Sequence, residues 1–413
     1  MYKNLVNKYF FILFSILPIS IVIGPMISLG NVLIIALSFL IYVTYINEWS
    51  WIKDKKIQLL FILYLYLIFN SFIGIEFSNS VNRNFGFIRF IIFFAAFNYF
   101  FFNYKNFYKI FIIWTIVIFI VALDIYYERL MGSNILGYGA GQRIFSFFNK
   151  PIAGSYMLGF FLLIIGFLFE FFKNKNFLRN YSRNYLIFTI SLIFLVSIFI
   201  TGERSNTIKA FLAFMIFYIF IRNFSFRQKT ISALVFLLLI TVVSMNSSII
   251  KHRYMNQLFV NFKTKDQFGT SITIWTYLNL YKSGIEVFKK YPYFGVGNKN
   301  YGFETCWDKE TYNPNYHCNS HPHQIYFEFL AEHGILGTII CLFIFFKLFF
   351  DLLRKIPITK NEIQFASFLY ILTVFMPLLP SGAFFSDNLL TLFFINFSLL
   401  FSCNKNTNIF YKK

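Results

Sequence analysis

The stretch "NVLIIALSFLIYVTYINEWSWIKDKKIQLLFILYLYLIF" (residues 31–69) decides the class of fold. Two apolar runs flank a short loop that carries Lys53, Lys55 and Lys56. Each run is near the ~20 residues that a helix needs to cross a bilayer. The same alternation of apolar run and polar loop extends along most of the chain. The pattern predicts an all-α polytopic membrane protein.

The composition agrees with that class. The chain has 413 residues, of which 58% are hydrophobic and only 13% are charged, whereas a soluble domain carries about 25% charged residues. Phenylalanine occurs 63 times, and Ile, Asn and Lys are over-used beside it. This looks like a bias of the whole genome, so no single Phe is interpreted as functional.

About twelve transmembrane helices are predicted, with boundaries good to ~2–4 residues. The apolar segments are 9–23, 30–47, 57–74, 86–102, 107–127, 152–172, 185–200, 207–221, 231–249, 326–350, 364–380 and 388–402.

The loops divide by charge into two alternating sets. By the positive-inside rule the basic set is cytoplasmic, together with both termini. The opposite face carries short turns and two longer pieces, 128–150 and 250–325. The chain therefore divides into spans one to nine (1–249), a large outer loop (250–325), and spans ten to twelve with a cytoplasmic tail (326–413). The basic residues are spread over seven cytoplasmic pieces without an aromatic-basic groove, which argues against a nucleic-acid partner.

Arginines gather on the outer face. "RNFGFIRF" contains Arg83 and Arg89, "GQRIFSFFNKPIAGSY" contains Arg143, and the turn "TGERSNTIK" contains Glu203 and Arg204. Several cations at one membrane face suggest a bound anion, and arginine matches phosphate geometry with a bidentate fork. Two structural alternatives remain open: interfacial snorkelling, which is preferred for Arg83, and a local Glu203–Arg204 pair.

Four of the five histidines lie between His317 and His333. In "HCNSHPHQIYFEF", Ser320 is a suitable N-cap and would place His321 and His323 in the first turn of the helix that enters span ten. A helix N-terminus lowers the pKa of an imidazole, and a neutral imidazole can take a proton from a hydroxyl. The alternative is a set of structural histidines.

Two cysteines frame the same region. Cys306 and Cys318 would lie outside the cytoplasm, where a disulfide is the simpler fate. Zinc is the rival interpretation, because Cys306, His317, Cys318, His321 and His323 are all ligand types, although their spacing matches no standard zinc pattern. The nearby "GVGNKNYG" misses the G-x-G-x-x-G spacing of a dinucleotide site. "ITIWTYLNLYKSGIEVFKKYP" before it predicts an amphipathic helix along the membrane surface, with Trp275 at the interface.

Taken together, these motifs resemble the O-antigen ligase family, the Wzy_C superfamily of lipid-linked polysaccharide ligases and polymerases. The resemblance covers roughly residues 80–400. Its motifs are "GER" (202–204), "PYFGVGNKNYGFETC" (292–306), "HPHQIYFEFLAEHGILG" (321–337), "PSGAFF" (380–385) and an outer arginine-to-proline pattern from Arg143 to Pro151. The order of the motifs and their placement on one membrane face also match the family.

The resemblance implies a GT-C-like membrane glycosyltransferase of the bacterial inner membrane with a large periplasmic loop and no cofactor. The donor would be a glycan on undecaprenyl pyrophosphate, and the acceptor would be lipid A–core for a ligase or a growing polysaccharide for a polymerase. His323 would be the general base, with His321 second. Arg204, Arg89 and Arg143 would bind the pyrophosphate.

Two positions depart from the family pattern. His323 precedes Gln324, where the family has Asn, and no arginine comes before Trp275 in the loop helix. Arg253 or Lys265 is a candidate substitute for that arginine. The competing class is a flippase for polyprenyl-linked glycans, which would require ionisable residues at mid-membrane. The predicted spans are nearly bare there.

Overall fold

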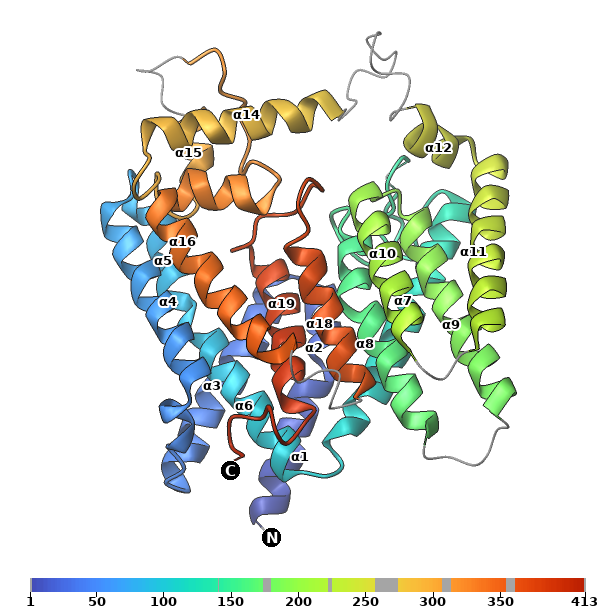
Figure 1. The fold of residues 1–413 in the computed structure, drawn as a ribbon, viewed down its shortest axis with the longest axis horizontal. Helices are drawn as coiled ribbons and strands as arrows, with labels where there is room; N and C mark the ends of the chain where they lie inside the picture. Colours follow the sequence, from blue (N-terminus) through green and yellow to red (C-terminus); the bar gives the residue numbers. More distant parts are fainter. Residues whose placement is uncertain are drawn as a thin grey trace.

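A computed structural model describes residues 2–139, 141–173, 180–221, 225–256, 274–306, 313–353 and 361–411. Every regular element in these ranges is a helix (Figure 1). The helices are α1 (Tyr2–Ser15), α2 (Leu17–Ile23), α3 (Pro25–Tyr45), α4 (Lys55–Ile73), α5 (Phe77–Gly86), α6 (Ile88–Asn103), α7 (Ile110–Met131), α8 (Ala153–Lys173), α9 (Asn180–Ile200), α10 (Arg204–Phe220), α11 (Phe226–Asn246), α12 (Ser248–Lys251), α14 (Ile274–Lys290), α15 (Tyr301–Cys306), α16 (Ile325–Leu353), α18 (Glu362–Val374) and α19 (Asp387–Ser402). Short 3₁₀ helices lie at Ser50–Lys53 and Phe107–Lys109, and one π-helical turn lies at His252–Asn256.

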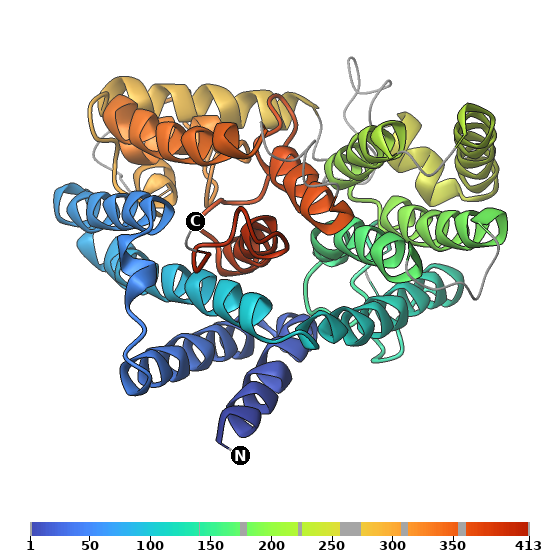
Figure 2. The ribbon, with the colours of Figure 1, turned by 60° about the horizontal axis from the view of Figure 1, so that its bottom comes forward.

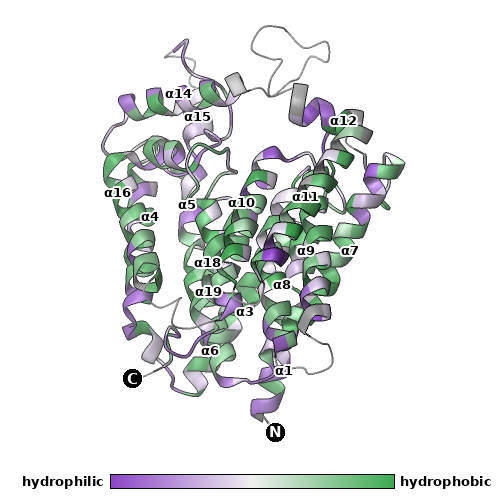
Figure 3. Ribbon diagram, turned by 45° about the vertical axis from the view of Figure 1, so that its right-hand side comes forward, coloured by the Kyte–Doolittle hydropathy of each residue, from purple (hydrophilic) through white to green (hydrophobic). Residues whose placement is uncertain are grey.

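The helices make this a polytopic membrane protein. Within the described ranges, seven helices are long and apolar enough to cross a bilayer, or eight if the bent pair at the N-terminus counts as one span. Apolar residues run along their length, and polar residues gather at their ends (Figure 3). A helix covers each of the twelve predicted segments, but α18 and α19 are shorter than a full span, and α10 and α11 are not among the seven or eight spans. The total of twelve crossings therefore stays a prediction.

The eleventh predicted segment ends earlier than expected. Helix α18 stops at Val374 rather than near residue 380. Pro377 and Pro380 follow, and a proline disfavours helical backbone at the residue before it. Residues 375–386 therefore form an irregular outer segment, in which Leu378 has a positive φ of 66°. This segment contains the "PSGAFF" motif.

Helix α19 lies at the centre of the bundle (Figure 2) and packs against α18, α6, α3 and α8. Its contacts are largely aromatic: the Phe394 ring stacks on Phe90 at 5.0 Å, and Phe397 lies 5.1 Å from Phe94. Hydrophobic burial contributes little between helices in lipid, so packing of this kind has to hold the bundle together. Helices α8 and α18 approach each other closely at Gly166. A Cβ at Gly166 of α8 would lie 2.6 Å from the Glu362 carbonyl of α18.

The outer segment 295–300 is fastened to the bundle by asparagines. Asn70 of α4 accepts a hydrogen bond from the Asn298 amide at 2.8 Å, and Asn84 of α5 accepts one from the Asn298 side chain. Asn300 donates to the Glu76 carbonyl at 3.0 Å. The "GVGNKN" motif is therefore a structural bridge, which places the outer helices α14 and α15 over the membrane helices (Figure 1).

Candidate active site

A cavity of about 690 Å³ opens between the membrane helices α8, α10 and α18 and the outer helix α14. One part of its wall is cationic and polar, and another part is aliphatic, with side chains of α8, α10, α18 and α19. The cationic and acidic residues are Arg143, Glu203, Arg204, Lys209 and Arg253, and the aliphatic residues include Ile152, Leu158, Ile208, Val374, Leu389 and Leu392. The cavity therefore suits a ligand with a charged head and an apolar tail.

Among the described residues, four cationic side chains and one carboxylate line this cavity, which leaves three positive charges in excess there. Arg253 comes from the turn after α12 and donates to the Gly202 carbonyl at 2.8 Å, beside the "GER" motif. Arg204 in turn donates to the Arg253 carbonyl at 3.4 Å. Burial, together with Arg143 and Arg204, lowers the pKa of Arg253 to about 10. Several cationic side chains gathered at one wall favour a polyvalent anion such as a phosphate.

The carboxylate of the cluster has its own partners. Glu203 accepts hydrogen bonds from the Gly154 amide at 2.7 Å and from the Asn206 side chain at 2.6 Å. Gly154 lies in the first turn of α8, where the helix dipole favours a negative charge. Burial raises the pKa of Glu203 above its ordinary value, against these bonds and the nearby Arg143. Glu203 therefore joins the "GER" turn to α8.

The histidine pair lies in an irregular segment and not in a helix, which corrects the prediction. Helix α16 begins at Ile325, and its cap is Gln324, whose side chain accepts from the Tyr326 amide at 2.8 Å. His323 itself has a positive φ of 58°, which a helix excludes. Ser320 is thus not the N-cap of α16. The pKa of each histidine is lowered as predicted, but a helix N-terminus is not the cause.

The cause is burial. The pKa of His323 lies below its ordinary value because the ring is desolvated, with a smaller contribution from Arg143. Burial, the neighbouring His323 and Lys299 lower the pKa of His321 to about 3. The two rings lie 4.0 Å apart. Only His323 of the pair lines the cavity, so it is the imidazole that a ligand there would meet.

The "PSGAFF" segment connects the histidine to the cationic cluster. The Pro380 carbonyl accepts from Lys209 at 3.1 Å and from the Ser205 hydroxyl, both on α10. The next residue, Ser381, donates its amide to the His323 carbonyl at 2.8 Å. Two adjacent residues therefore fix the distance between His323 and the helix that begins with Arg204.

The loop that carries Arg143 is held by two buried carboxylates of α7. Glu128 accepts from the amides of Phe145 and Ser146 at 3.0 and 2.5 Å. Asp124 accepts from the Ile135 amide at 3.1 Å and from the Ser146 hydroxyl at 2.7 Å. All four carboxylate oxygens accept a bond from the loop. This anchoring keeps Arg143 at the cavity.

Two other predicted outer residues lie elsewhere. Arg89, predicted to bind pyrophosphate, is 3.6 Å from Asp387 and is not part of the cavity wall. Arg83 is 2.9 Å from the same carboxylate and donates to the Phe385 carbonyl at 2.7 Å. Arg83 is therefore an ion-paired residue, and its interfacial snorkelling stays a prediction. The role of Arg89 as a phosphate ligand stays a prediction.

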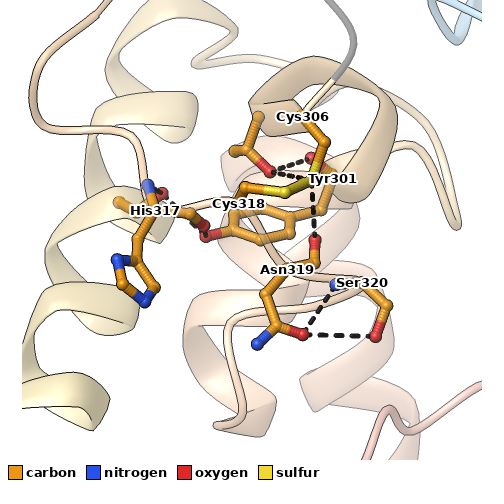
Figure 4. Close-up of a disulfide and its surroundings, with 8 residues drawn as sticks. Tyr301, Cys306, His317, Cys318, Asn319 and Ser320 are labelled. Carbon is orange, nitrogen blue, oxygen red and sulfur yellow. Dashed lines mark hydrogen bonds between the residues drawn. A yellow bond between two sulfur atoms is a disulfide. The ribbon is translucent and has the colours of Figure 1, made fainter. Parts of the chain in front are cut away.

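Cys306 and Cys318 form a disulfide next to the histidine segment (Figure 4). Ser283 of α14 accepts from the Tyr301 hydroxyl at 2.7 Å and from the His317 amide at 3.0 Å, which ties the same region to α14. The described residues contain no cluster of three or more His, Cys, Asp or Glu arranged for a metal ion. The disulfide takes both thiolates away from the zinc alternative.

Thiol counting tests the disulfide. We expect two reactive thiols per denatured chain before reduction, from Cys341 and Cys403, and four after reduction. The Cys306→Ser variant should show three before reduction, since Cys318 is then released. Four thiols in the unreduced wild-type protein would mean that Cys306 and Cys318 are not bonded.

The sequence had named Arg253 and Lys265 as substitutes for the missing loop arginine. Arg253 lies in the cavity wall, whereas Lys265 and Trp275 lie outside the side chains that the structure describes. Sequence reasoning missed Tyr277 and Tyr281 of α14, which also line the cavity. The two tyrosines are four residues apart in "WTYLNLY", which puts both on one face of the helix. This spacing is the sequence pattern that could have indicated them.

Residues 189–342 match the family model Wzy_C, described as O-antigen ligase. The matched range contains Arg204, Arg253 and His323, while Arg143 and the "PSGAFF" segment lie outside it. A search of curated proteins found no match. Over residues 189–342, which include Arg204, Arg253 and His323 of the cavity wall, the chain matches the O-antigen ligase family, Wzy_C.

Proposed function

We propose that the protein transfers a glycan from undecaprenyl pyrophosphate to an acceptor hydroxyl at the periplasmic face of the inner membrane. The single observation that carries this proposal is the cavity with three excess positive charges, one neutral histidine and an aliphatic wall. A glycan-carrying pyrophosphate diester bears about two negative charges, and its leaving group bears about three after the bond breaks. The positive charge of the cavity therefore complements the charge of the donor. It complements the larger negative charge of the departing lipid more closely.

These positions support the following reaction. The acceptor oxygen attacks the anomeric carbon while His323 takes the hydroxyl proton. The bond between the anomeric carbon and the pyrophosphate oxygen breaks, and its electrons remain on undecaprenyl pyrophosphate. Arg204, Arg253 and Arg143 stabilise the added charge in a site that needs little reorganisation. One displacement inverts the anomeric configuration.

Deletion of the gene tests the function and separates its two forms. If the protein is a ligase, we expect long lipid-linked chains to accumulate without transfer to lipid A–core. If it is a polymerase, the acceptor should carry single repeat units. Unchanged lipid-linked glycans and unchanged acceptor would contradict the proposal. Glycans that accumulate on the cytoplasmic side of the membrane would indicate a flippase instead.

The proposal also requires that the outer loop, residues 250–325, lies in the periplasm. We expect a cysteine at Tyr293, whose side chain is 67% exposed, to react with an impermeant thiol reagent in intact cells whose outer membrane is permeable. A cysteine at Lys105, in the loop predicted to be cytoplasmic, is the matched control and should react only after the inner membrane is broken. The reverse pattern would overturn the orientation.

A further inference from the structure

Helix α14 contributes two tyrosines to the wall of the cavity. Tyr277 and Tyr281 are one helical turn apart, and both line the cavity. The Tyr277 ring lies edge-on to His323, with 5.9 Å between the ring centroids. The Tyr281 ring stacks on Phe327 of α16 at 5.0 Å, which fixes its orientation. This part of the wall is aromatic and uncharged, and it adjoins the base.

Several neutral polar atoms of the same wall lack a hydrogen-bond partner. Within the described residues, this holds for the Tyr281 hydroxyl, the Ser381 hydroxyl and the Asn388 carbonyl oxygen, all of which are shielded from solvent. A buried polar group without a partner is destabilising, so each one calls for an explanation. All three residues line the cavity, and a ligand with several hydroxyl groups would supply the partners.

The cavity wall thus has three kinds of surface. The cationic part suits phosphates and the aliphatic part suits a polyprenyl chain, as the proposed function requires. The third part combines aromatic rings with neutral donors and acceptors. A pyranose has this character, since its C–H face packs on an aromatic ring and its hydroxyl edge forms hydrogen bonds.

Resting on the proposed function, we infer that Tyr277 and Tyr281 form a subsite for the sugar whose anomeric carbon is attacked. Tyr277 packs against the ring beside His323. Tyr281, Ser381 and Asn388 bond to the sugar hydroxyls. The subsite places the anomeric carbon between the base and the cationic cluster, and it selects donors by the first sugar and not by the lipid.

Two lipids test the subsite on the full-length protein in lipid nanodiscs. One is the lipid-linked glycan that accumulates in the deletion strain, and the other is undecaprenyl pyrophosphate. For Tyr281→Phe we expect the Kd of the glycan lipid to rise roughly fivefold, as for one neutral hydrogen bond. For Tyr277→Ala we expect roughly tenfold, because ring packing is lost. The Kd of undecaprenyl pyrophosphate should not change.

Protein stability gives a second readout. Tyr281→Phe removes a buried hydroxyl that lacks a partner, so the melting temperature without ligand should not fall. Tyr293→Phe is the matched control, because its side chain is exposed and lies outside the cavity wall, and both Kd values should stay at the wild-type level.

Either of two results overturns the inference. One is an equal rise in both Kd values for the tyrosine variants, and the other is an unchanged Kd for the glycan lipid. Failure of the proposed function looks different, since the wild-type protein would then bind neither lipid or would bind the glycan lipid without transferring its glycan to an acceptor.

Discussion

Replacing His323 by alanine is expected to reduce glycan transfer by roughly 10²–10⁴-fold, the usual loss when a general base is removed. His323 is the histidine of the pair that lines the cavity, and burial keeps its ring neutral. The measurement is transfer per mole of membrane-inserted protein. Near-normal transfer by His323→Ala would refute the assignment of the base.

His321→Ala is the matched control for this experiment. His321 contacts the His323 ring but does not line the cavity, so its removal should cost less activity. Equal losses at the two positions would not support the assignment of the base to His323 over His321.

The pH dependence of the wild-type enzyme gives a separate check on the same base. A depressed pKa means that His323 loses its proton below the ordinary value of about 6.5. The ratio kcat/KM should therefore be flat from about pH 7 to 8 and should fall only as the pH drops through that lowered pKa. A rise in kcat/KM centred above pH 7 would point to a different base.

The second large effect is expected at Arg204. Arg204→Ala should lose about 3–4 kcal/mol of transition-state stabilisation, which is roughly a 10²–10³-fold drop in rate. Arg204→Lys should not restore activity, because lysine keeps the charge but lacks the planar fork. Full specific activity in Arg204→Ala would remove the pyrophosphate clamp from this mechanism.

Two variants control for effects on folding. Arg83→Ala should keep its activity, because Arg83 lies outside the cavity wall and Arg89 stays beside their shared partner Asp387. Glu203→Ala should lower the amount of inserted protein, since Glu203 holds the start of α8. If Arg204→Ala also acts only through lower abundance, Arg204 has a structural role and no catalytic one.

Apolar runs predicted the seven helices that are long and apolar enough to cross a membrane in the described part of the chain, because a span leaves a long, local pattern in the sequence. They did not predict where α18 ends, since that depends on how Pro377 and Pro380 act within an apolar run. The capping of α16 was misread for a related reason. Serine has a higher intrinsic preference than glutamine for the N-cap position. The positive φ of His323, however, separates Ser320 from the helix, and the side chain of Gln324 forms the cap.

Residues of the site were predictable where local motifs carried them. His323 and Arg204 follow from short motifs, and Arg143 from its position on the outer face. Two other contacts join residues that are far apart in the chain: the ion pair of Arg83 with Asp387 and the hydrogen bond from Arg253 to the Gly202 carbonyl. No local pattern encodes such contacts. Tyr277 and Tyr281 were hidden by the abundance of aromatic residues, which gives each one little weight by itself.

The bonds at Pro380 and Ser381 have a consequence for motion. One residue binds α10, and the next binds the backbone of His323, so these bonds link the position of the base to the start of α10. Opening them apart to admit a bulky lipid would break several bonds at once. The donor lipid should therefore enter and leave the cavity by movement of a different part of the wall. The hydrogen bonds of Pro380 and Ser381 should stay intact through the whole turnover cycle.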